Sequence, residues 1–273
     1  MSLEIKNTKN LILPDKFRMV ALIYGLPGSG KTQWVGTAPN PGIAACETGE
    51  GNGLLTIAGM GHDYITPANY MEFEAFCNGN LFKDKSSIVL DSLSDVNQTF
   101  IKDYALSIPR TRGESPKRRL GIPELDDYGT MGEITRRTIR KLIDSYPDKH
   151  IFVTAKEKYD KADPENGQAE TLVGPELPGA MMLGSTAMFD FVFRIRTRQI
   201  LRDPKDPKSR FVQRYIQTAA DGQGTVAKCR GNQPDGKGHP LLDPIETINL
   251  ETGEGTIPWL LEKVRAGFTG QEK

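Results

Sequence analysis

The sequence has few cysteines, no long apolar run and no net charge. Its three cysteines, Cys46, Cys77 and Cys229, are scattered without the pairing typical of metal sites, so we expect reduced thiols in a cytoplasmic protein. No apolar stretch approaches the roughly 20 residues that cross a bilayer, and residues 1–10 lack the apolar core of a signal peptide. We therefore expect neither secretion nor a membrane partner.

The 35 basic residues balance the 35 acidic ones, so the chain as a whole is not a polycation. The basic residues are nevertheless unevenly placed. Residues 102–120 hold six basic and two acidic residues, and residues 194–214 hold eight and two. Local patches of this kind fit contact with a polyanion at one face, or ordinary solvated loops.

A glycine-rich segment follows the apolar run at residues 19–24 and fills every fixed position of the pattern G-x-x-x-x-G-K-[ST]. Glycines allow the backbone N–H groups to wrap around phosphate oxygens. Lys31 suits the β- and γ-phosphates, and Thr32 offers a hydroxyl to Mg²⁺. A turn that binds nothing is the alternative. The candidate nucleotide-binding residues are Gly25, Leu26, Pro27, Gly28, Ser29, Gly30, Lys31, Thr32 and Gln33.

Apolar strands alternate with helical segments through the first half of the chain, which predicts an α/β fold with a mostly parallel sheet flanked by helices. Shorter antiparallel strands are expected toward the C-terminus. The predicted strands are 19–24, 43–46, 87–91, 151–154, 189–196, 211–217 and 225–229, with a last hairpin at 247–258. The predicted helices are 66–78 (opened by Thr66-Pro67), 94–107, 127–146 (capped by Asp127) and 180–187, with a long exposed loop at 108–125 and a hairpin turn at Asn166-Gly167.

Two acidic residues end predicted strands. Asp91 closes an apolar strand, where a carboxylate can support Mg²⁺, although it could instead cap the following helix. Ser92 follows it rather than glutamate, so a base for the attacking water must come from elsewhere. Glu47 ends the second strand, and the carboxyl ends of parallel strands gather at one sheet edge. We therefore expect Glu47 and Asp91 to approach the γ-phosphate from neighbouring strands, unless Glu47 is only a solvated loop residue.

Together, residues 25–32, 45–47, 88–92 and 151–154 resemble the RecA-like ATPase core over about residues 18–200, in particular the shorter RecA-like proteins of bacteriophages that serve recombination and strand annealing. The resemblance implies a RecA-like P-loop NTPase core that uses ATP and Mg²⁺, with Glu47 activating water and Asp91 supporting the metal. RecA proteins carry Asn-Gln where this chain has Thr154-Ala155, so Thr154 or Lys156 is the candidate γ-phosphate sensor. The expected organisation is an N-terminal extension at 1–18, the ATPase domain at 19–235, and a C-terminal hairpin and helix extension at 236–273.

The resemblance favours an ATPase that acts on single-stranded DNA in phage recombination or replication, and a possible homo-oligomer in which Arg196 or Arg198 reaches a neighbouring nucleotide. Arg196 and Arg198 could equally be charges on an edge strand. A small-molecule kinase with a lid at residues 108–120 and a non-hydrolysing adaptor are the alternatives, while a GTP switch lacks its Asn-Lys-x-Asp motif. The candidate DNA contacts are Arg110, Arg112, Lys117, Arg118 and Arg119, with Lys156, Lys158 and Tyr159 as further candidates.

Overall fold

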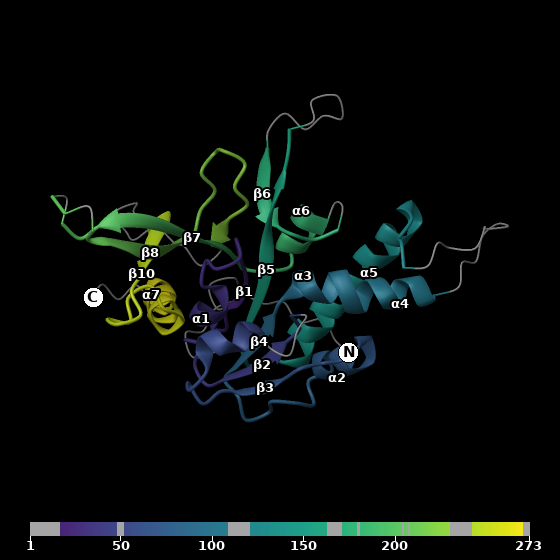
Figure 1. Ribbon diagram of the computed structural model, residues 1–273. Coiled ribbons are helices and arrows are strands. Elements are labelled where there is room, and N and C mark those ends of the chain that lie inside the picture. The colour runs from purple at the N-terminus through teal and green to yellow at the C-terminus, as the bar shows by residue number, and fades with distance from the viewer. Residues whose placement is uncertain are drawn as a thin grey trace.

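The computed structural model describes residues 17–47, 52–108, 121–162, 171–178, 181–203, 205–206, 208–229 and 242–269. Within them, ten strands form one mixed sheet in the order β10-β8-β7-β1-β5-β4-β2-β3, with β6 paired to β5 and β9 to β7 (Figure 1). The strands are β1 (Val20–Gly25), β2 (Pro41–Ala45), β3 (Asp63–Ile65), β4 (Ser87–Asp91), β5 (His150–Asp160), β6 (Leu172–Pro175), β7 (Phe191–Leu201), β8 (Arg210–Gln217), β9 (Lys228–Cys229) and β10 (Ile245–Ile248).

Helices cover both faces of this sheet, which confirms the expected α/β class. One buried cluster packs α2, α3 and α5 against the sheet, and a second packs α1 and α7 against its other face. Figure 1 accordingly shows α1 and α7 on one side of β1 and β5, and α4 and α5 on the other. The helices are α1 (Lys31–Val35), the 3₁₀ helix η3 (Asn52–Ile57), α2 (Tyr70–Cys77), α3 (Leu93–Val96), the π-helical η4 (Asn97–Ile101), α4 (Lys102–Ser107), α5 (Leu125–Ser145), α6 (Met181–Thr186) and α7 (Ile257–Thr269).

The central strands are parallel, as predicted. β1 pairs in parallel with β5, β5 with β4, β4 with β2, and β2 with β3. β7 was expected to be antiparallel, and this is wrong in part: it runs parallel to β1 and antiparallel only to β8 and β9. β5 and β7 both run parallel to β1, so the chain between them, through β6 and α6, forms a crossover of the kind that joins parallel strands.

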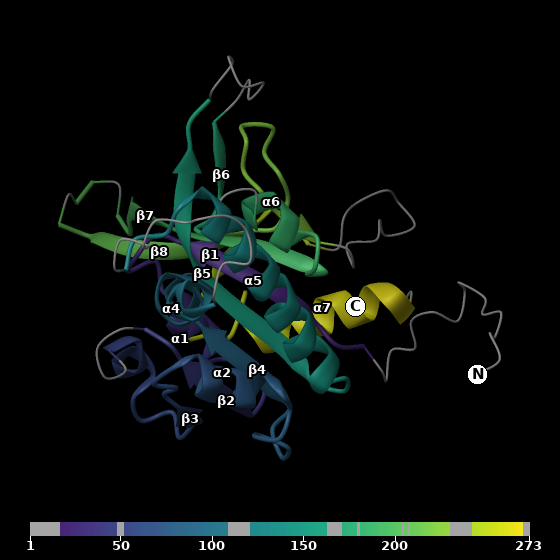
Figure 2. The same ribbon diagram turned by 90° about the vertical axis from the view of Figure 1, so that its right-hand side faces the viewer.

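The second half of β5 leaves the main sheet and pairs with β6 alone, from Glu157 opposite Pro175 to Asp160 opposite Leu172. Figure 2 shows these two strands projecting beyond the rest of the sheet. This antiparallel pair confirms the hairpin predicted after the fourth strand. The predicted turn residues, Asn166 and Gly167, lie outside the described residues.

Two helices begin at residues other than those predicted. The helix predicted over 66–78 begins at Tyr70 rather than after Thr66, because the Asn69 side chain accepts a hydrogen bond from the Glu72 backbone N–H at 3.0 Å and so caps α2. The cap of α5 is Glu124 rather than Asp127. Asp127 lies three residues into the helix and its carboxylate accepts a hydrogen bond from the Glu124 N–H at 2.9 Å, which completes a capping box.

The C-terminal segment does not form the predicted hairpin. β10 pairs antiparallel with β8, a turn closes with the Asn249 N–H donating to the Glu254 carbonyl at 2.8 Å, and α7 follows. The edge of β8 takes up β10, and the apolar side of α7, including Leu260 and Val264, completes the second buried cluster. The expected boundary near residue 236 lies outside the described residues, and no helix within the described ranges is long and apolar enough to cross a membrane.

His150, at the start of β5, makes stability depend on pH. It is 8% exposed and its Nδ1 accepts a hydrogen bond from the Met19 backbone N–H at 3.0 Å. Burial, aided by Arg265, lowers the pKa of His150 to about 4. The unfolded chain, with an imidazole pKa of about 6.5, therefore binds more protons between these values, and stability falls as the pH drops through this window.

We expect this one group to remove about 3 kcal/mol from the free energy of unfolding between pH 7 and pH 4. Urea denaturation at several pH values, for the wild type and for His150→Asn, measures the effect. Asparagine can still accept the Met19 hydrogen bond but does not titrate, so the variant should lose less stability over this range. Equal pH slopes for the two proteins would contradict the assignment.

Candidate nucleotide-binding site

The glycine-rich loop occupies the turn between β1 and α1. Gly28 and Gly30 have φ angles of 77° and 93°, a region in which side chains are strained. Gly25 is required for a different reason: a Cβ there would lie 2.5 Å from the Ile195 carbonyl oxygen on β7. These positions explain why glycine alone fits, and they give the loop the backbone geometry that cradles phosphate.

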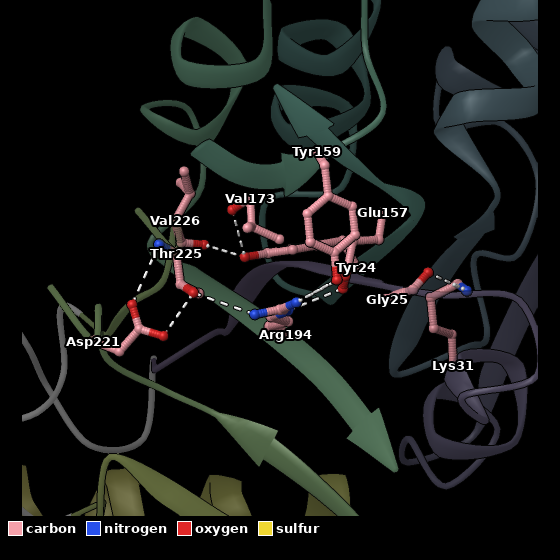
Figure 3. Close-up of polar contacts among 10 residues, drawn as sticks. All are labelled: Tyr24, Gly25, Lys31, Glu157, Tyr159, Val173, Arg194, Asp221, Thr225 and Val226. Carbon is pink, nitrogen blue, oxygen red and sulfur yellow. Dashed lines mark hydrogen bonds and ion pairs between the residues drawn. The ribbon is translucent and has the colours of Figure 1, made fainter. Parts of the chain in front are cut away.

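Lys31 lies over this loop rather than extending into solvent. Its Nζ donates a hydrogen bond to the carbonyl oxygen of Gly25 at 2.9 Å (Figure 3). It donates a second one to the carbonyl oxygen of Leu26 at 3.1 Å. Burial lowers the pKa of Lys31, while the nearby carboxylates of Asp91 and Glu47 act to raise it. The ammonium group is thus held at the loop by two neutral acceptors, and an anion entering the loop can replace them.

Asp91 is held between the hydroxyl groups of two threonines. Thr32 Oγ1 donates to Asp91 Oδ2 at 2.6 Å, and the Thr154 hydroxyl donates to Asp91 Oδ1. Asp91 is buried at the end of β4. A hydroxyl and a carboxylate are the hard oxygen donors that Mg²⁺ prefers, and this ion usually completes its coordination with substrate phosphates and water. Thr32 and Asp91 therefore fit the metal predicted for them.

Thr154, predicted as a candidate phosphate sensor, lies in β5 between β1 and β4, fully buried. Its hydrogen bond orients Asp91, and this is the role that its geometry supports directly.

Glu47 follows β2, and β2 is the direct neighbour of β4, with Ala45 opposite Asp91. The expectation that Glu47 and Asp91 come from neighbouring strands is therefore confirmed. A Cβ on Gly53 would lie 2.5 Å from Glu47 Oε2 and 3.6 Å from Thr32 Oγ1. The Glu47 carboxylate thus lies against Gly53 of η3, a residue that also borders the Thr32 hydroxyl, and only a glycine at position 53 leaves the carboxylate this space.

The pKa of Glu47 is raised, chiefly because burial disfavours the charged carboxylate and also because Asp91 and Asp95 are near; Lys156 and Lys31 act in the opposite direction. A carboxyl group whose pKa is moved toward neutrality is better matched to proton transfer than an ordinary exposed glutamate.

Lys156 forms an ion pair with Asp95, a residue that the sequence interpretation missed. Lys156 Nζ lies 2.7 Å from Asp95 Oδ1, and the Asp95 side chain is 5% exposed. The Ser92 hydroxyl donates to the other carboxylate oxygen of Asp95. The spacing Ser92-x-x-Asp95 at the start of α3 resembles a capping box and was the available signal. Lys156 is therefore placed near the site by an acidic partner on α3.

Comparison with known proteins decides the family. A family profile described as an AAA domain matches residues 18–231. The chain belongs to this AAA-domain family. Together with the sheet order and the phosphate-binding loop, this makes it a nucleotide-binding P-loop ATPase-type protein and bears out the RecA-like P-loop fold class expected from the sequence.

Other comparisons show little sequence similarity to this AAA-domain protein. No curated protein matches its sequence. Similar solved structures include the flagellar accessory protein FlaH from Methanocaldococcus jannaschii, with 11% identity, coverage of 87% of this chain and 88% of that one, and a TM-score of 0.39. The RadB recombinase is 13% identical, with 72% of this chain and 79% of that one covered and a TM-score of 0.35.

A buried ion pair lies beside the phosphate loop of the AAA-domain protein (Figure 3). Arg194 Nε and Nη2 donate to the two carboxylate oxygens of Glu157 at 2.9 and 2.8 Å, and the two side chains are 6% and 1% exposed. Arg194 Nη1 also lies 3.2 Å from the Thr225 hydroxyl oxygen, and that hydroxyl donates to Asp221 at 2.8 Å. The network joins β5, β7 and the segment before β9.

Tyr24, the residue before the loop, lies against the same network. Its hydroxyl is within hydrogen-bonding distance of the carbonyl oxygens of Val173, at 3.1 Å, and Val226, at 3.0 Å. Burial raises the pKa of Tyr24, so the phenol stays neutral. The loop, the β5–β6 hairpin and the segment before β9 are therefore connected by buried polar contacts.

The predicted polyanion contacts are only partly described. Arg110, Arg112, Lys117, Arg118 and Arg119 lie outside the described residues. Lys158 and Tyr159 lie on the β5–β6 hairpin, where Tyr159 is half exposed. The exposed Arg196 and Arg198 on β7 place their guanidinium carbons 5.8 and 5.7 Å from the ring centre of Tyr215 on β8.

Proposed function

We propose that this protein is a Mg²⁺-dependent ATPase in which Glu47 activates the attacking water. One observation supports this more than any other. The Thr32 hydroxyl donates to Asp91 at 2.6 Å, and Gly53 borders both that hydroxyl and the Glu47 carboxylate. A nucleotide loop, a metal-supporting pair and a carboxylate of raised pKa thus occupy one edge of the sheet, where α/β proteins bind ligands.

Each residue then has a defined part in hydrolysis. The loop amides hold the phosphates, and Lys31 moves from the Gly25 and Leu26 carbonyls to the β- and γ-phosphates. Thr32 and Asp91 would hold Mg²⁺, and the ion would neutralise charge on the phosphate oxygens.

The Glu47 carboxylate accepts a proton as the water oxygen bonds to the γ-phosphorus, and the bond from that phosphorus to the bridging oxygen breaks to release ADP and phosphate. Thr154 keeps Asp91 oriented. Asp95 positions Lys156, whose ammonium group can then contact the γ-phosphate.

We extend the proposal to single-stranded DNA as the polymer on which the ATPase acts. Arg196, Arg198 and Tyr215 form a surface of cations and an aromatic ring, a combination that suits phosphates and unstacked bases. Tyr159 and Lys158 on the projecting hairpin offer the same pair of chemistries. A role in recombination or replication, a phage origin and assembly of several copies rest on the sequence resemblance alone.

Turnover of ATP with and without single-stranded DNA, at two salt concentrations, tests this function. We expect DNA to stimulate turnover at low salt and the stimulation to fall steeply at higher salt, because binding through several phosphates weakens by roughly 10³-fold or more between about 50 and 200 mM salt. Lys31→Ala is the inactive control. Turnover that rises with a nucleoside monophosphate and ignores DNA would favour a kinase, and ATP binding without turnover would favour an adaptor.

A further inference from the structure

Arg214, on β8, reaches the phosphate-binding loop from the antiparallel side of the sheet. Its Cα lies opposite Thr197 on β7 and Ile248 on β10, far from the loop in sequence. A Cβ on Gly30 would lie 2.5 Å from Arg214 Nε and 2.8 Å from its Cδ. The side chain therefore passes over Gly30, the residue that caps α1 and directly precedes Lys31.

The Nε atom of Arg214 differs from the side-chain nitrogens of Arg194 and Arg198 on the neighbouring strand β7. It is buried and has no hydrogen-bond partner among the described residues. By contrast, Arg194 is paired with Glu157 and Arg198 donates to the Gln213 side chain at 2.8 and 3.1 Å. Leaving a buried charged donor without an acceptor costs more free energy than leaving a neutral donor without one. Such a group therefore calls for an explanation, and a ligand that supplies the acceptor is one.

We infer that Arg214 binds the phosphate groups of the nucleotide, from within the same chain and from the β8 side of the loop. This inference rests on the proposed function, because it needs a nucleotide in the loop. Loop amides near Gly30 cradle the α- and β-phosphates, whereas Lys31 serves the β- and γ-phosphates. Arg214 therefore holds the end of the phosphate chain that ATP and ADP share, and its planar donors suit phosphate oxygens.

This position assigns Arg214 to binding rather than to the chemical step. A contact that is equally strong with ATP and with ADP lowers both dissociation constants and leaves the rate at saturating ATP unchanged. The two cations then divide the phosphates between them. Arg214 anchors the part that remains after hydrolysis, and Lys31 contacts the part that changes.

Arg214→Met tests the inference, because methionine keeps an apolar stem of similar length and removes the guanidinium. We expect binding of MgATP and of MgADP to weaken by roughly 10- to 100-fold each, the range for losing hydrogen bonds to a charged group. Turnover at saturating ATP should stay within about twofold of the wild type. The melting temperature of the nucleotide-free variant should equal or exceed that of the wild type, since the substitution removes an unpartnered buried donor. Arg210→Met, on the same strand but exposed, is the matched control.

Three results would overturn the inference. The first is a wild-type affinity for both nucleotides in Arg214→Met. The second is a loss confined to ATP or to the turnover rate, which would move the contact away from the shared phosphates. The third is a lower melting temperature of the nucleotide-free variant, which would make Arg214 a structural residue. In each case the wild type still binds nucleotide, whereas failure of the wild type to bind either nucleotide would instead reject the proposed function.

Discussion

Glu47→Gln is expected to lower ATP turnover by roughly 10²- to 10⁴-fold, the range for losing a general base, while MgATP affinity stays close to that of the wild type. Glutamine is nearly isosteric with glutamate and can occupy the space beside Gly53, but it cannot accept the proton of the attacking water. The effect should therefore fall on turnover and not on binding. Single-turnover hydrolysis and equilibrium binding of a fluorescent ATP analogue separate the two quantities.

The pH dependence of turnover offers a second view of the same residue. Burial and the nearby Asp91 and Asp95 raise the pKa of Glu47, so the acidic limb of the wild-type pH profile should lie above the usual range for glutamate. In the glutamine variant this limb should disappear from the residual activity. Glu251→Gln, a substitution at an exposed turn, should change neither turnover nor its pH profile.

Gly53→Ala tests the position of the Glu47 carboxylate without changing its chemistry. The added methyl would lie 2.5 Å from Oε2, so the carboxylate must shift. We expect turnover to fall by at least about tenfold, since proton transfer needs hydrogen-bond distance between base and water. If neither Glu47→Gln nor Gly53→Ala slows hydrolysis, Glu47 is not the base.

Arg194→Met is expected to destabilise the fold by about 3–5 kcal/mol, the usual effect of removing one member of a buried ion pair. The reason is that Glu157, 1% exposed, would remain charged without its partner. Urea denaturation measures the change in the free energy of unfolding. The double variant Arg194→Met with Glu157→Gln should recover part of the loss, because it removes the uncompensated charge together with its partner.

Arg198→Met is the matched control for this prediction. Arg198 lies four residues further along β7 and donates to Gln213, but it is exposed, so its loss should cost at most about 1 kcal/mol. An Arg194→Met variant as stable as Arg198→Met would mean that the Arg194–Glu157 pair does not hold β5 and β7 together.

The nucleotide loop and its acidic partners could be predicted because the signal is local. The loop has fixed spacing, and Asp91 and Glu47 each end an apolar run. Buried parallel strands bring such ends together at one edge. The sequence of α5 also carries a local signal, because apolar residues recur at helical spacing along it, and two of them, Met131 and Leu142, are buried.

Other features depended on contacts between distant parts of the chain. The pairing of Arg194 with Glu157 joins residues 37 apart in the sequence. Arg214 reaches Gly30 in the glycine-rich loop between β1 and α1, near the other end of the chain. No sequence spacing marks either contact. Likewise, the sequence around Glu251-Thr252-Gly253 is typical of a hairpin turn, but the open edge of β8 took up β10 and the apolar face of α7 was needed to cover Trp34 and its neighbours. In the C-terminal segment, tertiary packing outweighed the local preference of the sequence for a hairpin.

The central claim is that a nucleotide binds on the loop at residues 25–32, with Thr32 and Asp91 supporting its metal. Titration calorimetry of the purified protein with ATP, with and without Mg²⁺, tests this most directly. The account predicts saturable binding that Mg²⁺ strengthens and that Lys31→Ala abolishes. Binding that is absent at millimolar MgATP, or that survives unchanged in Lys31→Ala, would contradict it.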